Sequence, residues 1–404
     1  MTKKQLVVVA LGVGLIALVV ANCEGPAGPQ GEPGPTGTGI IWKGSLAQAP
    51  ADPDTNWAYY NTADYVSYIY DGEFWDTLSF GAPGSDGADG VDMNSCAACH
   101  NDSTRLLAMQ LQYGASTHAL GTTFARNSAS CAACHTHEGY MLALSTGKIG
   151  KTVSVAPSDP TPPNCRTCHP VHTNFDVTDY GLRAPVDTVT MNLTSERLSL
   201  GKGAVCAHCH QPRTSYPVPT PDASDSVALS DRYGPHHSVQ ATVLAGSGGF
   251  EYPGSEAYAS TTVPDHYRTA DDACVTCHMA AAVGALSGGH TMKVSYESHG
   301  EMTMNTAGCV ACHDDAATLT AMCKELETEF DSLLNELEAI LIADNLIVAD
   351  SATGETVVAK DTVSANQAGA VWNYVTVKED GSRGMHNPVY VKALLKNTIE
   401  MLRP

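Results

Sequence analysis

Aromatic residues are scarce in this chain of 404 residues, at 6% of the sequence, and lysine and arginine together number only 22. The shortage of aromatics predicts little side-chain core, so something other than side chains must fill the interior. The 43 acidic residues outnumber the basic ones and give a formal charge of −21. Such a surface repels nucleic acid, which excludes it as a partner, and favours solubility or cationic partners.

Long apolar runs are equally scarce. The run from Leu6 to Ala21 follows two lysines and is short for a membrane span, so we interpret residues 1–22 as an export signal. The segment from Val20 to Cys23 resembles the lipobox of bacterial lipoproteins, which implies a lipid anchor on Cys23, although Asn22 departs from the usual small residue. An uncleaved anchor and a plain signal peptide are the alternatives. All three place the chain outside the cytoplasm, in the periplasm or at the cell surface, and a lipoprotein favours the outer membrane.

Glycine recurs at every third position in residues 23–39 and again in residues 81–92. This is the collagen period, but each run is too short for a stable triple helix, so both are interpreted as extended linkers. Between them, residues 40–80 alternate aromatic and polar residues around turn signals, which predicts small β-hairpins. This β-module resembles modules compared to carbohydrate-binding domains. Its aromatics either contact glycan or form a mini-core: Trp42, Trp57, Tyr59, Tyr60 and Trp75.

Twelve of the fourteen cysteines form six CxxC pairs, and a histidine follows every pair. A disulfide framework would not place His after each pair, and a cytosolic redox motif would not recur six times. Two cysteines at this spacing can form thioether bonds with one haem, and the His then binds its iron. Structural zinc is the alternative. The predicted sites are Cys96, Cys99 and His100; Cys131, Cys134 and His135; Cys165, Cys168 and His169; Cys206, Cys209 and His210; Cys274, Cys277 and His278; and Cys309, Cys312 and His313.

Ten further histidines can supply a second axial ligand: His118, His137, His172, His208, His236, His237, His266, His290, His299 and His386. This number suffices for six haem c groups with two histidines on each iron. Ligation by two histidines closes an iron to small molecules and suits electron transfer. The twelve methionines are an alternative that would raise reduction potentials, but it is secondary because the histidines suffice.

Several phrases of the sequence resemble the multihaem cytochromes that include cytochrome c nitrite reductase and hydroxylamine oxidoreductase. They cover about residues 93–404 and are CAACHTHEGY, CRTCHPVH, VCAHCHQPR, GPHHSVQATVLAG, CVTCHMA with GGHTM, and EDGSRGMHNPVY. The resemblance implies that His118, His172, His236, His290 and His386 are distal ligands. His266, which lies shortly before Cys274, is our sixth choice, and His237 is the main rival of His236. Each of these could instead be a surface or supporting histidine.

The fold class expected is mainly α with extensive loops, as in multihaem cytochromes, with a small N-terminal β-module. Residues 93–317 form the expected hexahaem region. Residues 318–404 are expected to be helices that pack on it. Leu319, Met322 and the apolar residues up to Leu341 follow helical spacing. Further helices are predicted from Ser364 to Gly381 and from Asn387 onward, where capping residues stand at the start. Cys323 is interpreted as a small buried residue of the first helix.

Three functions are compatible with these features. The first is an electron-transfer protein with closely spaced low-spin haems, which passes electrons to redox partner proteins or extracellular acceptors. The second is a reductase or oxidoreductase of nitrogen or sulfur compounds with one open haem. The chain has no CxxCK motif, which the resemblance would lead one to expect of a nitrite reductase. The third is a surface attachment protein whose β-module binds glycan.

Overall fold

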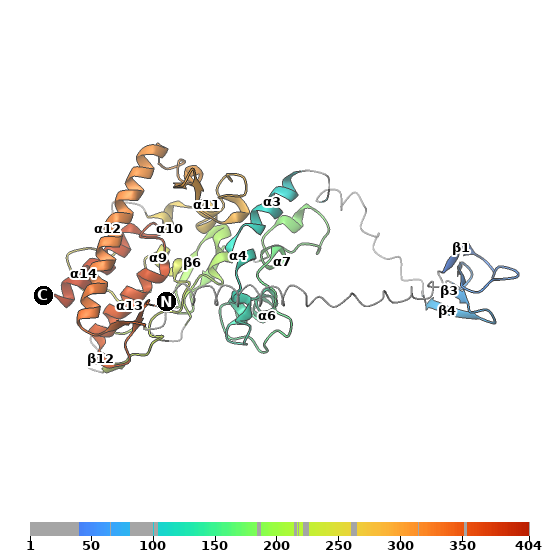
Figure 1. The fold of residues 1–404 in the computed structure, drawn as a ribbon, viewed down its shortest axis with the longest axis horizontal. Coiled ribbons are helices and arrows are strands. Elements are labelled where there is room, and N and C mark those ends of the chain that lie inside the picture. The colour runs from blue at the N-terminus through green and yellow to red at the C-terminus, as the bar shows by residue number, and fades with distance from the viewer. Residues whose placement is uncertain are drawn as a thin grey trace, which may run out of the picture. The chain divides into compact units, whose positions relative to one another are not determined.

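The computed structural model describes residues 40–64, 66–80, 100, 104–183, 187–213, 216, 218–220, 226–259, 265–313, 315–350 and 354–403 (Figure 1). They fall into two compact units, one within residues 1–90 and the other within residues 91–404. The predicted export signal, Cys23, both glycine runs, Cys96 and Cys99 lie outside the described residues. In the part of the chain that is described, no helix is long and apolar enough to cross a membrane.

The β-module is one sheet of four strands in the order β1-β2-β3-β4. The strands are β1 (Ile41–Leu46), β2 (Trp57–Asn61), β3 (Val66–Tyr70) and β4 (Trp75–Phe80). The two predicted hairpins are present, since β2, β3 and β4 pair antiparallel. Asn61 and Asp71 close these turns by accepting hydrogen bonds from the backbone of Ala63 and Phe74. The parallel pairing of β1 with β2 was not predicted.

Tyr59 lies at the centre of a small aromatic cluster in this sheet. Its side chain is buried, its ring stacks on Tyr68 at 5.7 Å between centres, and it meets the edge of Trp75 at 4.9 Å. Trp42, in contrast, is 53% exposed. Tyr59 therefore belongs to a mini-core, while Trp42 remains accessible to a ligand.

The part of the second unit up to residue 313 consists, where it is described, of short segments joined by loops (Figure 1). Its helices are α3 (Thr104–Gly114), α4 (Thr117–Leu120), α5 (Ala132–His135), α6 (His137–Ser145), α7 (Cys165–Cys168), α8 (Ala204–Ala207), α9 (Gln240–Ala245), α10 (His266–Thr269) and α11 (Cys274–His278). Single turns of 3₁₀ helix are η1 (Thr123–Ala125), η2 (Val177–Tyr180), η3 (Gly201–Gly203), η4 (Gly289–Thr291) and η5 (Thr306–Gly308).

Pairs of short antiparallel strands interrupt these helices, so the expectation of a mainly helical fold is confirmed only in part. They are β5 (Thr188–Thr190) with β6 (Arg197–Ser199), β7 (Ser226–Ala228) with β12 (Thr362–Ser364), β8 (Ser295–Ser298) with β9 (Glu301–Met304), and β10 (Ile347–Ala349) with β11 (Thr356–Val358). The β7–β12 pair joins the part with short helices to the C-terminal part of the chain.

Three long helices follow: α12 (Ala316–Ala343), α13 (Ala365–Asp380) and α14 (Pro388–Leu402). All three were predicted, and their caps explain where they start. Asp315, Ser364 and Asn387 each accept a hydrogen bond from a backbone N–H in the first turn. Gln367 completes the predicted capping box of α13. Gly381 ends that helix in the left-handed conformation, with φ of 65°.

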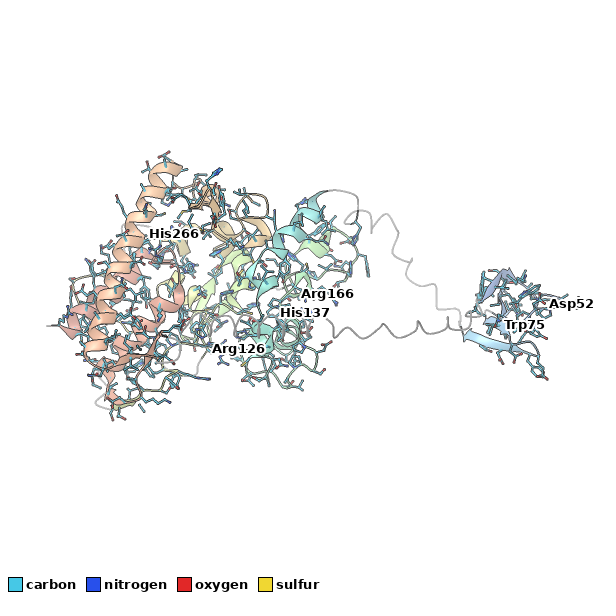
Figure 2. All side chains as sticks on the ribbon, in the orientation of Figure 1. Asp52, Trp75, Arg126, His137, Arg166 and His266 are labelled. Atoms are coloured by element: carbon cyan, nitrogen blue, oxygen red, sulfur yellow. The ribbon has the colours of Figure 1, made fainter. Side chains whose placement is uncertain are left out.

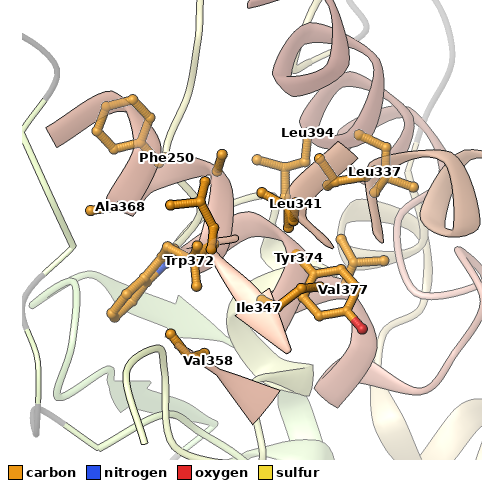
Figure 3. Close-up of a cluster of buried hydrophobic side chains, with 14 of the residues drawn as sticks. Phe250, Leu337, Leu341, Ile347, Val358, Ala368, Trp372, Tyr374, Val377 and Leu394 are labelled. Atoms are coloured by element: carbon orange, nitrogen blue, oxygen red, sulfur yellow. The ribbon is translucent and has the colours of Figure 1, made fainter. Parts of the chain in front are cut away.

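These helices pack around an apolar core that also includes residues 229–252 (Figure 3). Trp372, Tyr390, Leu337 and Leu394 are among its fully buried side chains. Each stabilises the fold by roughly 1.5–3 kcal/mol. The expectation of little side-chain core is therefore wrong for this part of the chain, where the few aromatic residues are concentrated.

On α12 the predicted apolar face is slightly misplaced. Met322 is 47% exposed, whereas Cys323 is buried, as interpreted from the sequence. The remaining buried positions of the helix, including Leu319, Phe330 and Leu337, follow the predicted spacing.

Candidate functional site

Each CxxCH motif with described cysteines forms a single helical turn. The backbone N–H of His169, His210 and His313 donates to the carbonyl of the first cysteine of its motif at 2.9 Å. His135 does the same at 3.2 Å, and the fifth motif is helix α11 itself. Residues three and four apart lie on one face of such a turn, so both thiols and the imidazole face the same side.

Every motif imidazole faces one histidine from outside the motifs. We number the sites by motif order and give the distance between ring centres. They are site 1, His100 and His172 (6.1 Å); site 2, His135 and His236 (6.4 Å); site 3, His169 and His290 (6.2 Å); site 4, His210 and His118 (6.0 Å); site 5, His278 and His386 (6.3 Å); and site 6, His313 and His266 (6.5 Å). The six histidines predicted as distal ligands are the six partners in these pairs.

The separation of the rings fits one metal ion between them. An imidazole nitrogen binds a transition metal at about 2 Å. The ring centre lies roughly 1 Å further away, so two imidazoles on opposite sides of one ion have centres about 6 Å apart. All six observed distances lie close to this value.

The partner histidines come from elements well separated from the motifs they face. His118 lies on α4, His266 at the start of α10, His290 in η4, and His386 immediately before α14. Figure 2 shows His266 at α10 in the second unit. The pairs therefore connect segments that are far apart in the sequence, and one of them reaches the C-terminal helices.

Hydrogen bonds at Nδ1 orient several of the paired rings. His278 meets the carbonyl oxygen of Met292 at 2.9 Å, and His266 meets that of Met385 at 2.8 Å. His169 lies within 3.0 Å of the carbonyls of Tyr180 and Gly181. A donor N–H at Nδ1 leaves Nε2 as the nitrogen available to a metal, and such partners are typical of metal-binding histidines.

His386 differs, because its Nδ1 meets a carboxylate oxygen of Asp380 at 2.7 Å. Burial lowers the pKa of His386, but the hydrogen bond and the charge of Asp380 outweigh it, so the pKa is raised. At three other paired rings, the loss of hydration on burial has the largest effect on the pKa. It lowers the pKa of His210 and His236 to about 4 and also lowers that of His118. These rings are neutral at neutral pH, which is the form that binds metals.

Four histidines are not paired with a motif imidazole among the described residues: His137, His208, His237 and His299. His137 contacts the hydroxyl of Thr167, and buried His208 contacts that of Tyr140, both at 2.9 Å between heavy atoms. His237, the predicted rival of His236, instead pairs with Glu379 at 2.6 Å.

Cysteines of different motifs lie next to each other. The thiol of Cys209 is within hydrogen-bonding reach of Cys134, and that of Cys206 is within reach of Cys274. Site 4 is therefore flanked by sites 2 and 5 on the cysteine side. Cys277 and Cys309 are also close enough for their charges to interact, which places site 6 beside site 5.

At site 2, a hollow is lined by both paired rings. It is lined by Cys131, Cys134, Cys209, His135, His236, His237, Gln211, Arg213 and Ser238. The buried Nε of Arg213 has no hydrogen-bond partner among the described residues, while one of its Nη atoms donates to the carbonyl of Ser130 at 2.8 Å. An unpaired guanidinium N–H beside this hollow fits an anionic group such as a haem propionate.

The sequence did not single out Arg213, Asp380 or Met292. Arg213 stands in the phrase VCAHCHQPR, three residues after the last residue of a motif, and this position was the available signal. Asp380 was recognised only as part of a helix end. Its contact with His386 depends on the turn between α13 and α14, which spacing alone does not define.

No family model and no curated protein matches the chain. Two solved structures are similar to it. The outer cell wall cytochrome OcwA has a TM-score of 0.44 and 21% identity, over 72% of this chain and 49% of that chain. An undecahaem cytochrome from the S-layer of Carboxydothermus ferrireducens has a TM-score of 0.36 and 21% identity, over 73% and 39%. The chain thus spans about half the length of the first and less of the second.

Proposed function

We propose that this protein is a hexahaem c-type cytochrome that conducts electrons through six low-spin haems, each with two axial histidines. The observation that carries the proposal is the one-to-one pairing of the six motif histidines with six others across about 6 Å. A haem bound there would be held by the two thioethers and both imidazoles. It would supply reversible one-electron chemistry.

The arrangement of the sites supports conduction from one haem to the next. Site 4 adjoins sites 2 and 5 through neighbouring cysteines, and site 6 adjoins site 5. His169 of site 3 and His172 of site 1 are only three residues apart, so one short loop serves both sites. Cys168 of site 3 also interacts with Cys206 and Cys209. Together these contacts join all six sites into one network with site 4 at its centre.

The location proposed for this network is the outside of the cell. The export signal and the lipobox at Cys23 support a lipoprotein of the outer membrane or cell surface, held away from the membrane by the glycine runs. Redox proteins or extracellular electron acceptors are the proposed partners, and the exposed Trp42 of the β-module supports a further contact with glycan.

The test combines intact mass with electron paramagnetic resonance of the oxidised holoprotein. We expect a mass increase of six haems and exclusively low-spin ferric signals. Two pairs have nearly perpendicular rings, at 73° and 75°, and the other four lie between 25° and 41°. Crossed imidazole planes give more anisotropic low-spin signals than parallel ones, so two haems should form a separate class.

Two results would contradict the proposal. Fewer than six attached haems would contradict the cofactor count. A high-spin signal from about one sixth of the haem would mean an open site, and the protein would then be the reductase or oxidoreductase considered above.

A further inference from the structure

Site 5 contains a carboxylate in direct contact with an axial imidazole. Asp380 accepts a hydrogen bond from His386 at 2.7 Å, and its side chain is only 2% exposed. Its second oxygen accepts from the hydroxyl of Ser382. Because Asp380 is buried, dissolved salt screens its negative charge only weakly.

Among the described partners of the other paired imidazoles, no carboxylate contacts Nδ1. Those partners are the carbonyls of Tyr180, Gly181, Met292 and Met385, the amide oxygen of Gln240 and the sulfur of Met292. No arginine or lysine of the described residues acts on the pKa of His386. Among the described contacts, site 5 is therefore the site where a carboxylate contacts an axial imidazole directly.

Site 2 has the opposite environment. After burial itself, Arg126 and Arg213 are the strongest influences that lower the pKa of His135, and both also lower that of His236. Arg213 lines the hollow of this site. The carboxylate of Glu379 is nearby, but it is paired with His237, whose pKa it raises, so its charge is largely compensated.

We propose that Asp380 and Arg213 set the two ends of the protein's range of reduction potentials, with site 5 lowest and site 2 highest. This inference rests on the proposed function. A ferric haem carries one more positive charge than a ferrous one. A carboxylate that accepts from an axial histidine stabilises the ferric form, and an adjacent guanidinium stabilises the ferrous form.

The position of site 4 allows the difference in reduction potential between sites 5 and 2 to drive electrons in one direction. It lies between sites 5 and 2, with Cys206 next to Cys274 and Cys209 next to Cys134. An electron that enters at site 5 therefore moves downhill through site 4 to site 2. Site 5 is oxidised and site 2 is reduced, with no further reactant. Electrons enter the network on the side of α13 and α14 and leave beside Arg213.

The test is a redox titration of the holoprotein, followed by optical and paramagnetic resonance spectra. In Asp380→Asn, the lowest-potential wave should shift upward and the other five should not move. In Arg213→Gln, the highest-potential wave should shift downward. Ser382→Ala removes the hydroxyl that withdraws charge from Asp380, so it should move the lowest wave further down. The two variants at site 5 should therefore shift the lowest potential in opposite directions. Structural damage to the site would not produce opposite shifts.

Glu336→Gln and Arg403→Gln are matched controls, because they make the same charge changes at an exposed ion pair. They should leave all six waves in place. The inference is overturned if Asp380→Asn or Arg213→Gln shifts a wave that is not at the stated end, or shifts none. Failure of the proposed function looks different, since the unmodified protein would then lack six low-spin haems.

Discussion

At the scale of single residues, the adjacent pair His236 and His237 shows how neighbours with the same chemistry acquire different roles. The ring of His236 faces His135 at 6.4 Å between centres. The ring of His237 meets Glu379 at 2.6 Å, and that hydrogen bond raises its pKa. Half-buried His236 can bind a metal together with the motif imidazole that it faces, whereas His237 is largely exposed and is paired with Glu379 instead.

Substitution of these two residues separates their roles. We expect His236→Ala to remove one axial ligand and convert one haem of six to the high-spin state, while all six remain attached through their cysteines. His237→Ala should leave every haem low-spin, because it removes only an exposed ion pair. Paramagnetic resonance of both variants provides the measurement. The reverse outcome would assign the ligand to His237.

The histidines that form the pairs could be predicted from the sequence. Which of them faces which motif could not. His118 faces His210, although the motif histidines His100 and His135 are both much closer to it along the chain. Such a pairing depends on the path of the whole haem region, because spacing in sequence places only residues of one turn or one strand pair. The roles of Arg213 and Asp380 could not be predicted for the same reason. They depend on the histidines of sites 2 and 5, which lie near these residues only in the folded chain.

At the scale of elements, α13 contains a glycine where the chain packs tightly. A Cβ atom on Gly369 would lie 2.6 Å from the ring of Phe250 and 2.7 Å from the hydroxyl of Tyr252. Alanine normally stabilises a helix interior by about 0.5–1 kcal/mol relative to glycine. Overpacking of a core typically costs about 1–3 kcal/mol. The steric cost is therefore expected to exceed the helical gain.

We accordingly expect Gly369→Ala to lower the thermal midpoint of the holoprotein, with a loss of roughly 1–2 kcal/mol in the free energy of unfolding. Gly114→Ala is the control, because Gly114 is the last residue of helix α3 and a Cβ there meets nothing within 4 Å. That variant should be neutral or slightly stabilised. Far-ultraviolet circular dichroism during heating gives both midpoints, and equal midpoints would disprove the packing argument.

Elements with local signals were predictable, and elements defined by distant partners were not. The three C-terminal helices begin at capping residues that can be read directly from the sequence. The two hairpins of the β-module follow from turn residues. In contrast, β1 pairs in parallel with β2 across a connection of ten residues, Ala47 to Asn56, and nothing local specifies that alignment.

At the scale of the whole molecule, the second unit is built in two ways. Its C-terminal part has a dense side-chain core that includes Trp372, Phe250 and Tyr390. The remainder has short helices, some of which overlap a CxxCH motif, such as α7 and α11, while others contain a histidine that faces a motif, such as α4 and α10. The aromatic content of the full chain could not predict this division into two parts. An average over 404 residues does not show that a few aromatics are gathered in one place.

The net charge of −21 is also a property of the whole molecule, and it gives a kinetic prediction. Small cations are drawn to such a surface and small anions are repelled, while salt weakens both effects. The Debye length falls from about 30 Å at 0.01 M to about 8 Å at 0.15 M salt. Over that range, oxidation of the reduced holoprotein by hexaammineruthenium(III) should slow by roughly tenfold, and oxidation by ferricyanide should accelerate.

Stopped-flow absorbance at a series of salt concentrations measures both rates on the same preparation. Opposite slopes for the two oxidants identify long-range attraction and repulsion, because a salt effect on the fold would move both rates in the same direction. Parallel slopes would mean that local positive charge, such as Arg126 and Arg213 at site 2, controls the approach of small reactants. In that case the exit side of the network, and not the acidic surface as a whole, would select its partners.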